Sequence, residues 1–137
     1  MRSSGLHMTI PFICVLIAFV LIYVTRVFVA TAQAKQPEGL DNRNPRAQQA
    51  KLTGLGARAQ AAHLNSFESF APFAAAVVIA HLAGADATWS AILASVHVGA
   101  RALYIGAYLG DIPTARSLIW MIGLLSTLGL FLLKWFA

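Results

Sequence analysis

Long apolar runs separated by short polar segments dominate the chain. The first run, at 10–32, reads IPFICVLIAFVLIYVTRVFVATA and is interrupted only near its end, by Thr25 and Arg26. Further runs of similar length lie at roughly 57–83, 88–110 and 116–136. A helix needs about 20 mostly apolar residues to cross a bilayer, and an open sheet leaves backbone groups unsatisfied in lipid. The pattern therefore predicts four membrane-spanning helices.

The connections between these runs predict how the helices are arranged. The segments AGADAT (83–88) and GDIPTA (110–115) are short turns, and short connections favour antiparallel neighbours. We therefore predict an all-α fold, an integral membrane four-helix bundle with up-down topology. The connection at 33–56 is longer and contains the turn signals QPEGLDNRNPRAQQ, so it is either an ordered lid or a mobile loop.

The N-terminus, the cysteine and the histidines suggest little additional chemistry. Residues 1–7 resemble a vector-derived tag remnant, so 8–137 is expected to form a single domain that begins at Met8. Cys14 lies in an apolar run and is expected to be a small buried side chain. We expect His81 and His97 to be packing residues and expect no metal site, because no cluster with ligand spacing surrounds either histidine.

Composition and charge also indicate a membrane protein. The chain is 58% hydrophobic and 11% charged, whereas a soluble domain is about 25% charged. Its net charge is +5, but the basic residues lie in loops and at span ends, which argues against a nucleic-acid partner. The 83–88 turn has no basic residue, whereas the 33–56 loop holds Lys35, Arg43, Arg46 and Lys51. The positive-inside rule therefore predicts that this loop is cytoplasmic and that both termini are outside.

Polar residues inside the runs form stripes at the helical repeat of about 3.6 residues per turn. The three stripes are Arg58, Ala61, Ala62, Asn65, Glu68, Ser69 and Pro72; His97, Arg101, Tyr104, Tyr108 and Asp111; and Arg116, Trp120, Gly123 and Thr127. Together with Arg26, their charged members lie in the half of the bundle next to the 33–56 loop, and the opposite half is almost purely apolar. Ionisable groups in spans usually face a bundle interior or a water-filled cavity. The asymmetry predicts a polar cavity that opens to the cytoplasm, with four arginines around the single acid Glu68.

Taken one at a time, most of these residues also have structural explanations. Arg58 and Arg116 can extend to lipid headgroups, and Tyr104 and Tyr108 can belong to an interfacial aromatic belt. Glu68 is harder to explain in this way, because it lies about three turns into its run. It needs a cationic partner or a proton, so it marks either a binding site or a structural ion pair.

Three stretches of the chain resemble one known family. RAQAAHLNSFE (58–68), ARALYIGAYLGD (100–111) and PTARSLIW (113–120) are similar to the MAPEG family, the membrane-associated proteins in eicosanoid and glutathione metabolism. The likeness extends from about Met8 to the C-terminus, and NPR (44–46) with the short length resembles the bacterial branch. The resemblance implies a homotrimer in the bacterial inner membrane, surrounded by membrane lipids, with sites between subunits that face the cytoplasm.

The resemblance also implies that glutathione is a cosubstrate and which residues hold it. Asn65 and Glu68 match the Asn-x-x-Glu pair that binds the γ-glutamyl end, and Arg116 matches the catalytic arginine that stabilises the thiolate. The other residues expected to bind glutathione or a similar ligand are Arg26, Arg58, Arg101, Tyr104, Tyr108 and Ser117. The chemistry is reasonable, because a nearby arginine favours an ionised thiol and guanidinium groups suit carboxylates.

Two functions remain open on the sequence. The first is a membrane-embedded, glutathione-dependent transferase or peroxidase that acts on hydrophobic electrophiles or hydroperoxides. The alternative is a non-catalytic membrane protein that binds an anionic lipid or amphiphile in the same cavity, because relatives carry further second-helix arginines where this chain has Ala61 and near Leu64. A transporter or channel is disfavoured, since the apolar half has no polar residues to continue a path.

Overall fold

The computed structural model describes residues 9–136, and all of the regular structure in this range is helical. In chain order the helices are α1 (Ile10–Ala34), α2 (Pro45–Ala50), α3 (Gly54–Leu82), α4 (Ala87–Leu109), α5 (Pro113–Leu132) and a 3-10 helix, η1 (Leu133–Phe136). The prediction of an all-helical chain is confirmed. The tag remnant predicted at residues 1–7 lies outside the described residues.

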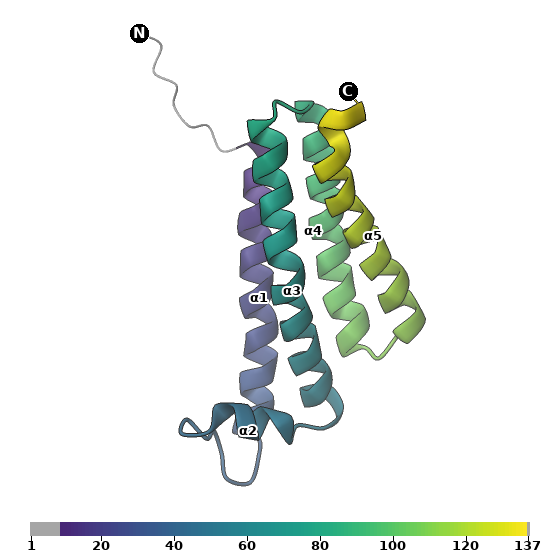
Figure 1. Ribbon diagram of the computed structural model, residues 1–137. Coiled ribbons are helices and arrows are strands. Elements are labelled where there is room, and N and C mark those ends of the chain that lie inside the picture. Colours follow the sequence, from purple (N-terminus) through teal and green to yellow (C-terminus); the bar gives the residue numbers. More distant parts are fainter. Residues whose placement is uncertain (1–8, 137) are drawn as a thin grey trace.

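The four long helices lie side by side, and each runs antiparallel to the long helix before it (Figure 1). α1 packs mainly on α3, and α4 packs mainly on α5. α4 also contacts α1 and α3, and α3 also contacts α5, so the two pairs form one body. The short α2 lies at the end of the body where α1 ends and α3 begins (Figure 1).

Three of the helices are long and apolar enough to cross a membrane, namely Ile10–Ala34, Ala87–Leu109 and Pro113–Trp135. Among the described residues α3 is not in this group, although the sequence predicted a span at 57–83. The physical reason is its polar N-terminal half, which carries Arg58, Asn65 and Glu68. Many large apolar side chains on the three apolar helices are exposed, as expected for surfaces that contact lipid.

Small residues let the helices pack closely around the aromatic ring of Phe73. Phe73 of α3 is completely buried, and it packs with Ala76 and Val77 of α3, Ala94 of α4 and Leu130 of α5. Small side chains such as alanine let membrane helices approach closely. Cys14 of α1 is buried in the same cluster, as predicted.

The connection between α1 and α3 is ordered around buried glutamines. Gln33 Nε2 donates to Gln48 Oε1 (3.0 Å), and Gln48 Nε2 donates to the Gly39 carbonyl oxygen (2.6 Å). Arg26 in turn donates to Gln33 Oε1 (3.0 Å). These hydrogen bonds hold the segment against the end of α1, and the sequence pattern missed the short helix α2 within it.

The turns after α3 and α4 close in the same way. Gly84 has φ of 66° and Ala85 N donates to the Ala80 carbonyl oxygen (2.9 Å). After α4, Asp111 takes the left-handed position with φ of 58°, and Ile112 N donates to the Ala107 carbonyl oxygen (2.9 Å). Glycine adopts this conformation freely, and aspartate is one of the few other residues that tolerate it. The second turn therefore holds a carboxylate at the C-terminal end of α4.

Candidate functional site

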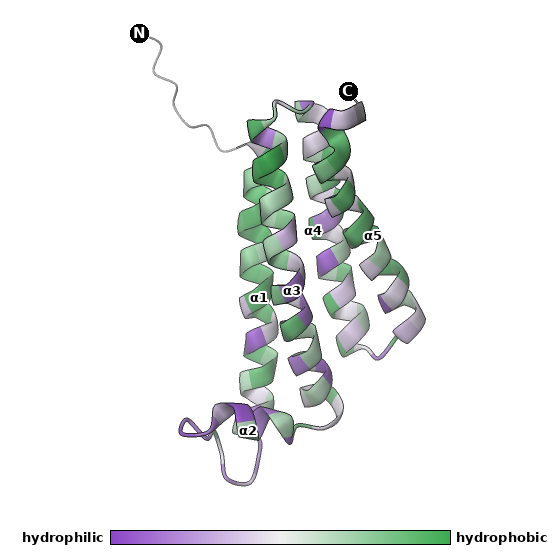
Figure 2. Ribbon diagram, viewed as in Figure 1, coloured by the Kyte–Doolittle hydropathy of each residue, from purple (hydrophilic) through white to green (hydrophobic). Residues whose placement is uncertain are grey.

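Hydrophilic positions within the long helices gather in the half of the molecule nearer α2, and the other half is mainly hydrophobic (Figure 2). The C-terminal end of α1, the N-terminal half of α3, the C-terminal half of α4 and the start of α5 meet in this half (Figure 1). Antiparallel packing is the reason, because it brings the end of one helix beside the start of the next. The polar stripes of α3, α4 and α5 consequently lie at similar depths.

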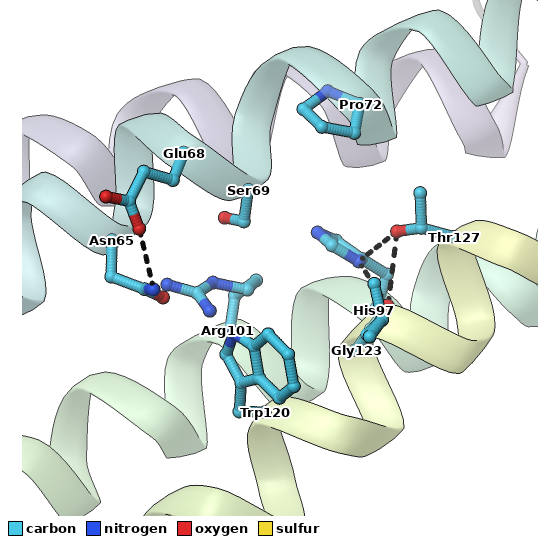
Figure 3. A pocket seen from close by; sticks show the side chains of 10 residues that line it. Asn65, Glu68, Ser69, Pro72, His97, Arg101, Trp120, Gly123 and Thr127 are labelled. Carbon is cyan, nitrogen blue, oxygen red and sulfur yellow. Dashed lines mark hydrogen bonds between the residues drawn. The ribbon is translucent and has the colours of Figure 1, made fainter.

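A cavity of about 160 Å³ lies between α3, α4 and α5. It is lined by Asn65, Glu68, Ser69, Pro72, His97, Arg101, Trp120, Gly123, Leu124 and Thr127, most of which Figure 3 shows facing one another. All of these except Leu124 belong to the three stripes found in the sequence. The helical repeat had therefore already selected the faces that enclose the cavity.

Opposite charges line this cavity without neutralising each other. Asn65 Nδ2 donates to Glu68 Oε2 (3.1 Å), and Arg101 is only 4% exposed. Within residues 9–136, Glu68 and Arg101 form no ion pair, and neither Arg101 Nη2 nor Asn65 Oδ1 has a hydrogen-bond partner. Buried polar groups are costly unless they are paired. The cavity therefore offers a carboxylate, a guanidinium donor and an amide oxygen to a ligand.

His97 lies one turn along α4 from Arg101 and lines the same cavity. Its ring stacks on Phe73 with centroids 3.9 Å apart and 7° between the planes. Its Nδ1 lies 3.1 Å from the Gly123 carbonyl oxygen and 3.0 Å from Thr127 Oγ1, both on α5. The packing role expected for His97 is confirmed, but its Nε2 has no hydrogen-bond partner among residues 9–136, and the sequence did not predict its place in the cavity lining. The signal that could have predicted this position is the spacing of four residues between His97 and Arg101, which puts both side chains on the same face of α4.

A second, more open hollow of about 380 Å³ is lined by Tyr104, Arg116, Ser117, Trp120 and Met121. Trp120 lines both this hollow and the cavity. The guanidinium carbon of Arg116 lies 4.4 Å from the centroid of the Tyr108 ring, and that of Arg101 lies 4.3 Å from the Tyr104 centroid. The two tyrosine rings meet edge to face, with centroids 5.5 Å apart. A continuous series of aromatic and cationic side chains therefore links the two hollows.

Arg26 and Arg58 lie outside both hollows. Arg58 Nη1 is 3.6 Å from Asp111 Oδ2, and its Nε donates to the Leu109 carbonyl oxygen (3.3 Å), so this side chain joins α3 to the end of α4. Arg26 is engaged with Gln33 of its own helix. The four arginines therefore do not surround Glu68 within one chain, since Arg101 alone lines the cavity with it.

The structure thus distributes the nine predicted site residues over three places. The cavity contains Asn65, Glu68 and Arg101; the hollow contains Tyr104, Arg116 and Ser117, with Tyr108 under Arg116; and Arg26 and Arg58 lie toward the end of the body near α2. Among the described residues, no three His, Cys, Asp or Glu side chains gather as a metal site would require.

Comparison with known proteins identifies the family. Neither a curated protein nor a solved structure matches the chain. The model of the MAPEG family matches residues 10–135, which is nearly the whole chain. Together with the three apolar helices, this match makes the protein an integral membrane protein. The chain belongs to the MAPEG family.

Proposed function

We propose that the protein is a membrane-embedded, glutathione-dependent transferase or peroxidase that acts on hydrophobic electrophiles or hydroperoxides. One observation carries the proposal beyond family membership. Glu68 and Arg101 line one cavity without pairing with each other, and Asn65 contacts Glu68 there. The α-amino acid group of a γ-glutamyl residue has an ammonium that suits a carboxylate and a carboxylate that suits a guanidinium.

Arg116 is the residue proposed to activate the thiol. A free thiol has a pKa of about 8.5, and a neighbouring guanidinium favours the ionised, nucleophilic form. The position of Arg116 in the open hollow, beside Ser117, leaves it accessible to a ligand. An electrophile dissolved in the bilayer would reach the thiolate from the lipid side of α5, where Leu118, Met121 and Leu125 are exposed.

The proposal includes a homotrimer with the sites between subunits. Support comes from the size of the cavity, which at about 160 Å³ is below the range of about 300–1,000 Å³ found for most ligand pockets. Glu68 and Arg116 also line different hollows, which favours a site that a neighbouring copy completes. The number of subunits follows from the resemblance to the family.

The proposed topology has four helices crossing a bacterial inner membrane, with the 33–56 loop in the cytoplasm and both termini outside. α3 would be the fourth span in spite of its polar half. Asn65, Glu68 and Ser69 line the cavity, and Arg58 is engaged at the end of α4. These side chains therefore have polar neighbours within the protein. With 29 residues, α3 is roughly 43 Å long, which exceeds the hydrocarbon core of about 30 Å.

The test is thiol conjugation by the detergent-purified protein. We expect it to join glutathione to a generic aromatic halide such as 1-chloro-2,4-dinitrobenzene, followed by the absorbance of the product. Arg116→Ala should abolish turnover, whereas Arg43→Ala, an exposed loop arginine, should leave turnover unchanged. Glu68→Gln should weaken glutathione binding at least tenfold, measured by calorimetry, because it removes a charge-assisted contact. Equal affinities would reject the proposed ligand site.

The alternative is a non-catalytic protein that binds an anionic lipid or amphiphile in the same cavity. The observation that favours it is the guanidinium of Arg101, which is buried beside the apolar side chains of Pro72 and Leu124 in the cavity lining. Absence of turnover with any thiol, together with a tightly co-purifying anionic lipid found by mass spectrometry, would reject the enzyme and support this alternative.

A further inference from the structure

A separate cavity lies at the end of the molecule opposite α2, and the proposed function does not use it. It has a volume of about 90 Å³ and lies where α1 and α4 begin and α3 and α5 end (Figure 1). It is lined by Thr9, Pro11, Phe12, Val77, His81, Ala85, Ala87, Ser90 and Leu130. Along α3 and α4, the buried Phe73 and Ala94 lie between this end cavity and the cavity that contains Glu68. The two cavities are therefore distinct.

One buried polar side chain in the lining of the end cavity lacks a hydrogen bond. Ser90 is 8% exposed, and within residues 9–136 its hydroxyl has no hydrogen-bond partner. The buried Ser66 and Ser126, in contrast, each donate to the carbonyl oxygen four residues earlier on their own helix. Thr9, which also lines the end cavity, makes no side-chain capping hydrogen bond. A buried hydroxyl is costly unless it is paired, so the Ser90 hydroxyl calls for a partner in the cavity.

The other residues of the lining favour an uncharged ligand with a small apolar part. Among the described residues around the end cavity there is no Lys, Arg, Asp or Glu, and the apolar side chains of Val77 and Leu130 are each 1% exposed. A charged group would therefore be buried without an opposite charge, which is very unfavourable. A cavity of about 150 Å³ holds one benzene molecule, so this one accommodates roughly three or four non-hydrogen atoms.

The depth of the end cavity indicates where its ligand is found. Trp89 directly precedes Ser90 and is 57% exposed, and Trp135 of η1, at the same end of the molecule, is 83% exposed. Exposed tryptophans of membrane proteins gather at the interface between the hydrocarbon and water. Ser90 therefore lies near the level at which amphiphilic molecules keep their polar ends.

We propose that the end cavity binds the hydroxyl end of an uncharged aliphatic amphiphile, with Ser90 hydrogen-bonded to the hydroxyl and Val77 and Leu130 in contact with the first carbons. A hydroxyl both donates and accepts, so it pairs with a serine in either direction. This chemistry has two sources, a short alcohol dissolved in water and the glycerol end of a monoacylglycerol in the bilayer. The site requires neither glutathione nor turnover, and it goes beyond the proposed function.

Protection of an introduced thiol tests the site. The single cysteine of the chain is Cys14, so a Cys14→Ala, Ala87→Cys protein carries one thiol, at an exposed position of the lining. Its rate of modification by methyl methanethiosulfonate is followed by intact-mass spectrometry in detergent-solubilised protein. The ligands are 1-butanol, butyrate, butylammonium and monooctanoylglycerol. We expect 1-butanol to slow the modification at concentrations at least tenfold lower than either ion of the same chain length, because each ion would be buried without a counter-charge.

Three further substitutions separate the proposed contact from general effects. Ser90→Ala removes the hydroxyl and keeps the apolar lining, so 1-butanol should bind about fivefold more weakly, the loss expected for one hydrogen bond. Ser126→Ala is the matched control, because Ser126 is also buried but lies outside this lining, and it should leave the affinity unchanged. Ala83→Cys in place of Ala87→Cys puts the thiol at an exposed position outside the lining, where no ligand should protect it. Thermal unfolding of each variant confirms that it is folded.

The two alcohols distinguish the sources of the ligand. Protection by 1-butanol supports the site and assigns it to small soluble alcohols, and protection by monooctanoylglycerol supports it and assigns it to a bilayer lipid. Equal protection by butyrate or butylammonium, an affinity for 1-butanol that is unchanged in Ser90→Ala, or equal slowing at position 83 would overturn the proposal. Absence of protection by both alcohols would overturn it too.

Discussion

Two buried histidines join pairs of helices in nearly the same way. His63 of α3 places Nδ1 3.0 Å from the Ile22 carbonyl oxygen and 3.1 Å from Thr25 Oγ1, both on α1. His97 of α4 places Nδ1 3.1 Å from the Gly123 carbonyl oxygen and 3.0 Å from Thr127 Oγ1, both on α5. In both cases the threonine hydroxyl also donates to that carbonyl. The α1–α3 and α4–α5 contacts therefore use one local arrangement.

The two arrangements differ on the other side of each ring. His63 meets the ring of Phe67 edge-on at 5.2 Å, and Phe67 is 49% exposed. His97 stacks on the fully buried Phe73 and lines the cavity. The same anchoring of Nδ1 therefore serves packing at the α1–α3 contact, and at the α4–α5 contact it also orients a nitrogen toward a cavity. The local contacts of a histidine are not enough to reveal its role.

The largest expected effect comes from removing the ring that each histidine meets. Phe73→Ala should lower the free energy of unfolding by about 3–5 kcal/mol, because it leaves a cavity in a fully packed region. Phe67→Ala, the matched substitution, should cost less than about 1 kcal/mol because Phe67 is half exposed. Unfolding by SDS in mixed micelles, followed by circular dichroism, measures both. Similar losses would mean that the two contacts are equally packed and that the contrast is wrong.

An intermediate loss of stability is expected from substituting the two threonines whose hydroxyl groups contact the histidines. Thr25→Val and Thr127→Val each remove a hydroxyl from a buried interhelical contact, so each should cost about 0.6 kcal/mol in the same unfolding measurement. The two losses should be similar, because the Thr25–His63 and Thr127–His97 contacts are equivalent. A loss confined to one variant would show that the two contacts are not equivalent.

The smallest effect is expected from loss of charge in the Arg58–Asp111 ion pair, an exposed polar contact between helices. The Asp111 side chain is 66% exposed, so Asp111→Asn should change the free energy of unfolding by less than about 0.5 kcal/mol. Asp111→Ala should cost about 1 kcal/mol, because alanine is strained at φ of 58°. Gly84→Ala is the control, since Gly84 occupies the equivalent turn position at φ of 66°. If Asp111→Asn lowers the free energy of unfolding as much as Asp111→Ala does, then Asp111 stabilises the protein through its ion pair and not through its backbone conformation.

The sequence predicted the faces of the site better than the contacts of its residues. Helical periodicity placed Asn65, Glu68 and Arg101 on stripes that enclose one cavity in the structure. It also left His63 off the α3 stripe, and the ring indeed contacts α1. Periodicity could not show that Arg58 contacts Leu109 and Asp111, since that depends on how far α3 extends past the end of α4.

By itself, the sequence determined that the chain is helical, that it lies in a membrane, and that its polar groups share one half of the bundle. These properties follow from apolar length, helical repeat and charge position, which are local and additive along a chain. Only the tertiary structure decided that Trp120 lines both hollows, that Glu68 and Arg101 do not pair, and that His97 turns its Nε2 into the cavity. Those outcomes depend on the rotation and depth of one helix against another, and side-chain packing sets both.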